Sequence, residues 1–103
     1  VKNEEPTYYA NTSKVSTSQF ASGSIIEGQV ANSVLSRNIH VHKDSLVKDS
    51  ILFPRVVIGE GAQVEYAILD KGVEVADGVV IRGTAEHPVV VKKGAKVTED
   101  IHS

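Results

Sequence analysis

The sequence predicts an all-β protein, a single-stranded parallel β-helix of about five coils built from near-hexapeptide repeats. Large apolar residues recur with gaps of five, six and six positions, so the whole pattern returns at Val30, Val47, Val64 and Ile81. No α-helix has a period of five or six, and a single strand alternates with a period of two. Short strands separated by tight turns fit this spacing, with three strands in each coil.

The repeat places like residues above like in successive coils. Three ladders are expected, one on each face: Val30, Val47, Val64 and Ile81; Leu35, Leu52 and Leu69; and Val41, Ile58 and Val75. A second inward row is expected four positions further along each face: Val34, Ile51 and Ile68; Ile39, Val56 and Val73; and Ser45, Ala62 and Val79. Strands of successive coils pair in parallel about 4.8 Å apart, so these rows are expected to enclose a dry interior.

The corners between strands have their own signature. Residues that tolerate a left-handed backbone follow many ladder positions at a spacing of three: Asn38, Asp44, Gly61, Gly72 and Gly78. Further on, the segment 82–88 fits the ladder poorly, and Pro88 has no backbone N–H to donate. We expect a loop or a frayed final coil there, and a last rung that contains Val91 and Val97.

Upstream, Val15, Phe20 and Ile26 continue the series, and a gap of only four positions before Val30 makes the first coil shorter. We assign residues 15–103 to the β-helix domain. Residues 1–14 are assigned to a linker or capping segment from a missing preceding domain, because the chain starts at Val1 rather than at a methionine. The chain is therefore expected to be a fragment of a longer protein.

Composition narrows the class of protein. Hydrophobic residues make up 41% and charged residues 23% of the chain, as in folded globular proteins. The formal net charge of -2 gives no electrostatic attraction to nucleic acid or to an anionic membrane. The chain has no cysteine, no visible signal peptide and no apolar run near the ~18 residues of a membrane span. We expect a cytoplasmic protein with neither nucleic acid nor membrane as a partner.

Several segments resemble the C-terminal β-helix domain of glucose-1-phosphate adenylyltransferases. The similarity extends over essentially the whole chain and is carried by these segments: Pro6–Tyr9, Ile25–Gly28, Ser33–Arg37, Ile51–Arg55 and Gly83–Val91. The last of these is more similar to the D-type subunit (GlgD) than to the catalytic C-type subunit. The resemblance implies a left-handed coil, and a preceding Rossmann-like nucleotidyltransferase domain that holds ATP, the sugar phosphate and Mg²⁺.

The resemblance also implies a function. The parent enzyme would convert ATP and glucose 1-phosphate to ADP-glucose and diphosphate in glycogen biosynthesis. This chain would lack catalytic residues and cofactors of its own. It would contact its own N-terminal domain and the catalytic subunit of a homo- or hetero-tetramer, and form half of an effector pocket. Family members place two lysines near the activator's phosphate, and the matching positions are Lys71 and either Lys92 or Lys93.

Simpler and rival interpretations stay open. Each of these lysines lies at or beside a corner, where exposed polar residues are expected on structural grounds alone. Arg37 and Arg55 lie one coil apart at similar repeat positions and could form an exposed basic stripe for subunit or effector contact, although surface arginines are the simpler interpretation. His40 and His42 suggest the rival function, a hexapeptide-repeat acyltransferase in which one histidine is the general base, although surface histidines are the simpler interpretation. With His87 and His102, the four histidines lack metal-ligand spacing, so no bound metal is expected.

Overall fold

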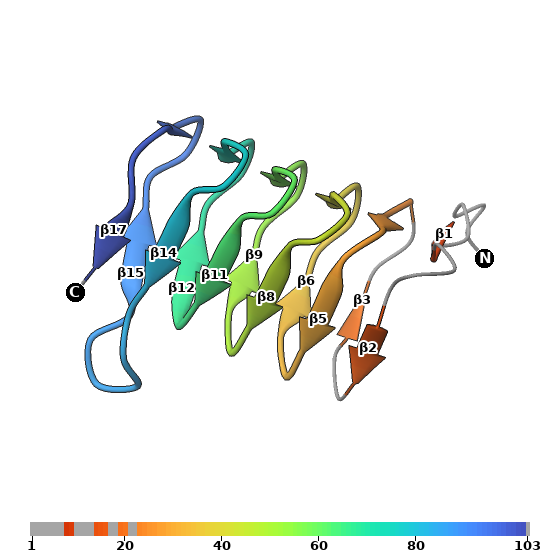
Figure 1. Cartoon of the computed structure of the whole chain (residues 1–103), viewed down its shortest axis with the longest axis horizontal. Coiled ribbons are helices and arrows are strands. Elements are labelled where there is room, and N and C mark those ends of the chain that lie inside the picture. Colours follow the sequence, from red (N-terminus) through yellow and green to blue (C-terminus); the bar gives the residue numbers. More distant parts are fainter. Residues whose placement is uncertain (1–7, 10–13, 17–18, 21–22, 103) are drawn as a thin grey trace.

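The protein is a stack of coils in which strands pair in parallel with strands one coil away. A computed structural model describes residues 8–9, 14–16, 19–20 and 23–102, and describes side chains from residue 23 onwards. These residues form 17 short strands and no helix. Three sheets run along the solenoid, which has about five coils (Figure 1). The predicted fold class, an all-β hexapeptide-repeat β-helix, is confirmed, and its left hand stays a prediction from the resemblance.

Each coil contributes one strand to each sheet. Sheet A contains β1 (Tyr8–Tyr9), β4 (Ile25–Ile26), β7 (His40–Val41), β10 (Val57–Ile58), β13 (Glu74–Val75) and β16 (Lys96–Val97). Sheet B contains β2 (Lys14–Ser16), β5 (Gln29–Ala31), β8 (Leu46–Lys48), β11 (Gln63–Glu65), β14 (Val80–Arg82) and β17 (Ile101–His102). Sheet C contains β3 (Gln19–Phe20), β6 (Val34–Leu35), β9 (Ile51–Leu52), β12 (Ala67–Leu69) and β15 (Val89–Val91).

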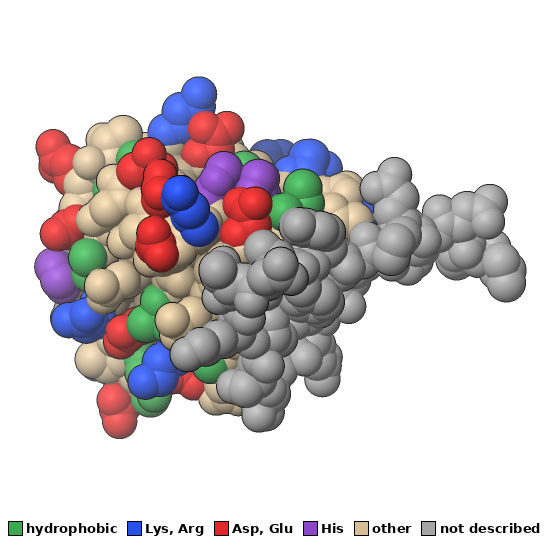
Figure 2. All heavy atoms as spheres, turned by 45° about the vertical axis from the view of Figure 1, so that its right-hand side comes forward, with side chains coloured by type: hydrophobic (Ala, Val, Ile, Leu, Met, Phe, Trp, Pro, Cys, Tyr) green, Lys and Arg blue, Asp and Glu red, His purple; other side chains and the backbone are tan. Residues whose placement is uncertain are grey.

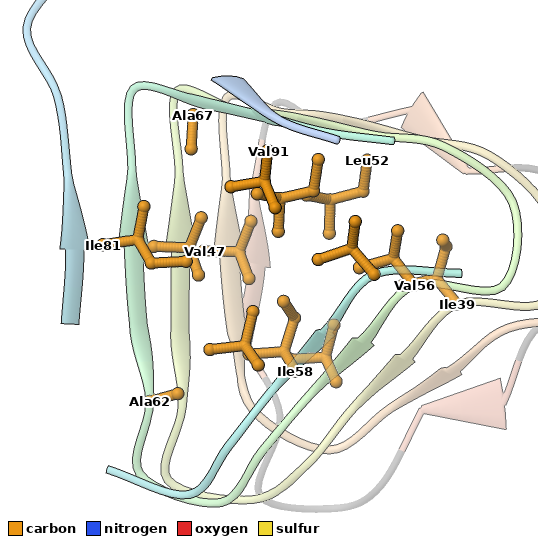
Figure 3. Packing of buried hydrophobic residues seen from close by; sticks show 14 of the residues in the cluster. Ile39, Val47, Leu52, Val56, Ile58, Ala62, Ala67, Ile81 and Val91 are labelled. Carbon is orange, nitrogen blue, oxygen red and sulfur yellow. The ribbon is translucent and has the colours of Figure 1, made fainter. Parts of the chain in front are cut away.

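The three predicted ladders are confirmed. The strand register pairs Val30 with Val47, Leu35 with Leu52, and Val41 with Ile58, and the ladders continue in the following coils. All ten ladder side chains are at most 2% exposed. Figure 3 shows Val47, Leu52 and Ile58, one from each sheet, pointing into the same interior. Burial of these rows supplies the main driving force for folding.

Of the three second rows expected inside, one is wrong. The rows with Ile39 and with Ser45 are buried as predicted, but Val34 and Ile51 are 46% and 41% exposed. The buried row at that corner contains instead Ser33, Ser50 and Ala67. Val34 directly precedes the inward Leu35 in the same strand, and neighbouring residues of a strand point to opposite faces. The shorter gap on this side of the coil therefore turns the expected row outward.

The buried serines at this corner satisfy backbone groups of the adjacent coils. The Ser33 hydroxyl donates to the carbonyl oxygen of Ala31 over 2.9 Å and accepts from the amide of Ser50 over 3.1 Å. One coil later, the Ser50 hydroxyl donates to the carbonyl oxygen of Lys48 over 2.8 Å and accepts from the amide of Ala67 over 3.2 Å. This serine ladder places polar atoms inside the solenoid without leaving them unpaired.

The corners use the left-handed backbone conformation, as predicted. All five selected residues have positive φ: Asn38 (60°), Asp44 (63°), Gly61 (73°), Gly72 (70°) and Gly78 (74°). Sequence analysis missed Arg55 and Tyr66, whose φ angles are 66° and 50°. Side chains of these types cost about 1–2 kcal/mol in this conformation. The register of neighbouring coils imposes it on them.

Coil length varies at two corners. The first complete coil runs from Ile26 to its partner Val41, and it is shorter than the next coil, which runs from Val41 to Ile58. The shortening falls at the corner that contains Gly28. A Cβ at Gly28 would lie 2.7 Å from the carbonyl oxygen of His42 in the next coil. Only glycine fits this close approach without a shift of backbone.

The loop predicted at 82–88 is present between β14 and β15. It extends away from the coils in Figure 1 and is closed by reciprocal backbone hydrogen bonds of 3.2 Å between Thr84 and His87. Before it lies the buried Gly83, whose Cβ would meet the Val89 amide nitrogen at 2.8 Å. After the loop, β15 pairs with β12 in the regular register, so the insertion leaves the ladders unchanged.

The expected linker of residues 1–14 is only partly described. Tyr8–Tyr9 form β1, which pairs with β4, and Lys14 begins β2, which pairs with β5. Sheet pairing therefore starts before residue 15, and residues 1–7 and 10–13 lie outside the described part. No helix within the described ranges is long and apolar enough to span a membrane.

Candidate functional site

Basic side chains gather at the corner between sheets C and A. The amide of Gly94 donates to the carbonyl oxygen of Lys71 over 2.9 Å, and the amide of Arg55 donates to that of Arg37 over 3.3 Å. These bonds stack the corners of successive coils. We call the exposed residues along this corner the basic edge: Arg37, Arg55, Lys71, Lys92 and Lys93.

The strand register gives different corner positions to Lys92 and Lys93, which the sequence left as alternatives. Because Leu69 pairs with Val91, Lys93 lies one coil from Lys71 at the same corner position, and Lys92 lies one coil from Asp70. Lys92 also lines a shallow hollow of about 490 Å³ at the C-terminal end of the solenoid. Of the two, Lys93 is therefore the positional equivalent of Lys71.

The basic edge is not neutralised by the acidic side chains that the structure describes. None of its five side chains has a carboxylate oxygen within 4 Å among residues 23–102. Its acidic neighbour Asp70 accepts a hydrogen bond of 2.7 Å from the backbone amide of Lys71. Ammonium and guanidinium groups without an internal partner attract anions, and guanidinium fits phosphate in a bidentate manner. The edge can therefore hold a phosphate or another anion.

A second surface feature is apolar. The row of side chains that turns outward on sheet C runs through four successive coils: Val34, Ile51, Ile68 and Val90. Val90 is 66% exposed, and Phe53, which follows β9, is 37% exposed. A contiguous exposed apolar row on a sheet is characteristic of a surface that another protein covers. We call these four residues the apolar row.

A third feature brings both candidate catalytic histidines together. The rings of His40 and His42 stack with centroids 3.8 Å apart and an interplanar angle of 15°. His40 Nε2 lies 3.2 Å from Glu27 Oε1, and His42 Nδ1 lies 4.0 Å from the same oxygen. Figure 2 shows adjacent histidine side chains beside an acidic one on this face. Sequence analysis missed Glu27, which joins the histidines only because the first coil is shorter than the regular repeat.

This arrangement bears on the acyltransferase alternative. A carboxylate hydrogen-bonded to an imidazole orients it, as a general base requires. His42 also borders a groove of about 220 Å³ along the outer face of sheet A, between β10 and the residues after β16. The groove is lined by both charged and small side chains, including Glu74 and Lys96. The general-base role of either histidine stays a prediction.

Comparisons with known proteins support the resemblance seen in the sequence. The chain is 40% identical to the glycogen biosynthesis protein GlgD of Bacillus subtilis (strain 168) over 94 residues, which is 91% of this chain and 27% of that protein. It is 41% identical to a glucose-1-phosphate adenylyltransferase of Bacillus cytotoxicus over 80 residues, or 78% of this chain and 21% of the relative. The chain thus spans about a quarter of the length of these relatives.

Among solved structures, WeeI from Acinetobacter baumannii AYE superposes with a TM-score of 0.77 at 22% identity, covering 91% of this chain and 50% of that one. At this identity the likeness concerns the fold alone. A family model described as GlmU-like, C-terminal hexapeptide matches residues 6–100. The repeat, the stacked ladders and this match agree, and the chain belongs to the GlmU-like C-terminal hexapeptide family.

Proposed function

We propose that this chain is the C-terminal β-helix domain of a cytoplasmic glucose-1-phosphate adenylyltransferase subunit, of the GlgD type. The observation that carries the proposal is its 40% identity to GlgD over 91% of the chain. Because the chain matches only 27% of that relative, the sites for ATP, Mg²⁺ and glucose 1-phosphate belong to the remainder of the parent. The β-helix then contributes contacts and regulation rather than chemistry.

Under this proposal the apolar row is a contact surface between protein domains. Its members project from neighbouring strands of sheet C and form one continuous strip. Covering exposed apolar area stabilises an interface by about 25 cal/mol per Å² before the costs of association. The partner is the chain's own N-terminal domain or a catalytic subunit of the same tetramer.

The basic edge is then the half of the effector pocket that this domain supplies. Lys71 and Lys93 lie at equivalent corner positions, so both ammonium groups can reach one phosphate held between coils. This equivalence, set by the pairing of Leu69 with Val91, favours Lys93 over Lys92 as the second lysine. Two cations at a domain seam bind an anionic effector more tightly in one placement of the domains than in another, and this difference is the basis of regulation.

The test uses the complete parent chain, which includes the N-terminal domain, alone and with a C-type partner. ADP-glucose formation from ATP and glucose 1-phosphate is measured with and without sugar phosphates and related anions as effectors. Activity that increases when this subunit joins the partner supports the proposal. If the subunit neither associates with the partner nor alters ADP-glucose formation, the proposal is wrong.

A separate assay addresses the acyltransferase alternative. The 103-residue chain is incubated with acetyl-coenzyme A and amino sugars, and release of free thiol is followed. Thiol release that disappears in His40→Ala or His42→Ala would favour the alternative over the adenylyltransferase assignment. Without thiol release, the adenylyltransferase assignment is preferred.

A further inference from the structure

We propose that Glu27, His40 and His42 form a binding site for one divalent transition-metal ion of the Zn²⁺ class. Each residue offers one ligand atom, and the three atoms lie within 4.8 Å of one another. Two imidazole nitrogens and one carboxylate oxygen are a common ligand set for zinc, with a fourth position left to water or to a further ligand. The inference is independent of the adenylyltransferase assignment.

The fold fixes the ligands on one outer face of sheet A. His40 and His42 flank the inward Val41, so both point outward from the same strand edge. Ile26 pairs with Val41, which brings the next residue, Glu27, alongside His42. The Glu27 amide donates to the Val41 carbonyl oxygen over 2.8 Å. The backbone that carries all three ligands is thus held in register across two coils.

The distances suit a small ion after a modest movement. Zinc bonds of about 2.0–2.2 Å place the ligand atoms of a tetrahedral site roughly 3.3–3.5 Å apart. The His40–Glu27 separation is 3.2 Å and the His42–Glu27 separation is 4.0 Å, so the latter must shorten. The rings are nearly parallel, and their lone pairs must converge on the ion. Side chains that are 33–38% exposed have room for this rotation.

Local electrostatics leave the carboxylate available. Within the described residues, the cationic group nearest the cluster in sequence, Lys43, pairs with Glu60 over 3.6 Å rather than with Glu27. The partners of the Glu27 carboxylate are the two imidazoles. A metal ion would replace the His40–Glu27 hydrogen bond with three coordination bonds, one from each residue. It would also link two neighbouring coils next to the shortened corner that contains Gly28.

Metal binding is measured on the 103-residue chain after treatment with EDTA. Isothermal titration with ZnCl₂ gives stoichiometry and affinity, and titration with CoCl₂ reports coordination through visible absorption. We expect one ion per chain and a higher unfolding midpoint with Zn²⁺, because a ligand that binds only the folded state stabilises it. His40→Ala, His42→Ala and Glu27→Gln should each weaken binding at least about tenfold.

The matched control is His102→Gln, which removes an exposed histidine from β17 at the other end of the solenoid. This variant should bind Zn²⁺ as the unaltered chain does. Glu27→Gln preserves side-chain size, and its unfolding midpoint without metal shows whether the fold survives. Equal uptake of Zn²⁺ by the unaltered chain and by Glu27→Gln and His40→Ala would overturn the proposal, as would an unaltered chain that binds no ion.

Discussion

Lys93 occupies, one coil further on, the corner position of Lys71. The hydrogen bond from the Gly94 amide to the Lys71 carbonyl oxygen fixes this relationship at 2.9 Å. The greater length of that coil does not disturb it, because the added residues leave the solenoid as a loop. Two positive charges are thereby held together on one edge, although a whole coil and the loop separate them along the chain.

The first prediction concerns anion binding by this pair. In the complete parent chain, Lys71→Ala and Lys93→Ala should each raise the concentration of phosphorylated activator needed for half-maximal response several-fold. Added NaCl should produce a similar weakening, because exposed charges are screened within about 10 Å at 0.1 M salt. The control is Lys48→Ala on sheet B, an exposed lysine remote from the basic edge, which should leave the response unchanged. A larger effect from Lys92→Ala than from Lys93→Ala would contradict the choice of Lys93 as the second lysine of the pocket.

The apolar row yields a prediction about assembly. Ile51→Asp and Val90→Asp place a charge on a surface that we propose is covered, and a buried unpaired charge is costly. Sedimentation velocity of the parent should therefore show a loss of tetramer in favour of smaller species. Leu46→Asp, on the outer face of sheet B, is the comparison and should retain the tetramer. Identical sedimentation of all these variants would exclude the row as a subunit contact and leave intramolecular docking as its role.

Neighbouring residues of β9 differ sharply in their expected contribution to stability. Leu52 is 0% exposed and Ile51 is 41% exposed. Leu52→Ala should reduce the free energy of unfolding by about 2–5 kcal/mol, whereas Ile51→Ala should cost less than about 1 kcal/mol. Urea denaturation of the 103-residue chain measures both. Equal losses would mean that the assignment of inward and outward faces is wrong.

The serine ladder should be sensitive to loss of one hydroxyl. Ser50→Ala leaves the buried amide of Ala67 without its acceptor, at a cost of about 1–3 kcal/mol. Ser36→Ala removes a hydroxyl from a partly exposed position and should change stability by less than about 0.5 kcal/mol. Amide hydrogen exchange at Ala67 provides a local check. Unchanged protection of this amide in Ser50→Ala would show that the hydroxyl is dispensable.

Alanine substitutions at two glycines distinguish the cost of a steric clash from the cost of a left-handed backbone angle. Gly83→Ala introduces a Cβ only 2.8 Å from the Val89 amide nitrogen and should cost about 3 kcal/mol or more. Gly78 has a φ of 74° but open space around its Cβ, so Gly78→Ala should cost only about 1 kcal/mol. Thermal unfolding ranks the two variants. The reverse order would indicate that the loop after Gly83 yields to the added methyl group.

Most of the fold could be predicted from the sequence because the repeat encodes it directly. The period of the apolar pattern fixes which residues stack, and the three ladders and five corner residues follow from it. The row with Val34 was assigned to the wrong face because the spacing of large apolar residues outweighed the alternation within a short strand. Ser33 and Ser50 were not recognised as core residues, since their burial depends on backbone partners in other coils.

The candidate sites were less predictable. The rung with Val91 and Val97 was expected from the sequence and is confirmed, but the choice between Lys92 and Lys93 stayed open because the match to the second lysine of the family is ambiguous by one residue. The association of Glu27 with His40 and His42 depends on the shortened first coil. Sequence analysis considered the spacing among histidines alone, and its expectation of no metal stays a prediction that the titration with Zn²⁺ will test.

The loop between Thr84 and Pro88 has a further consequence. After the loop, β15 pairs with β12 in the regular register. The number of residues in the loop therefore does not affect the spacing of the coils. Residues can be added or removed there without turning any ladder to the wrong face. The loop is therefore the most suitable place to attach a fluorophore or an epitope while the coils on both sides keep their alignment.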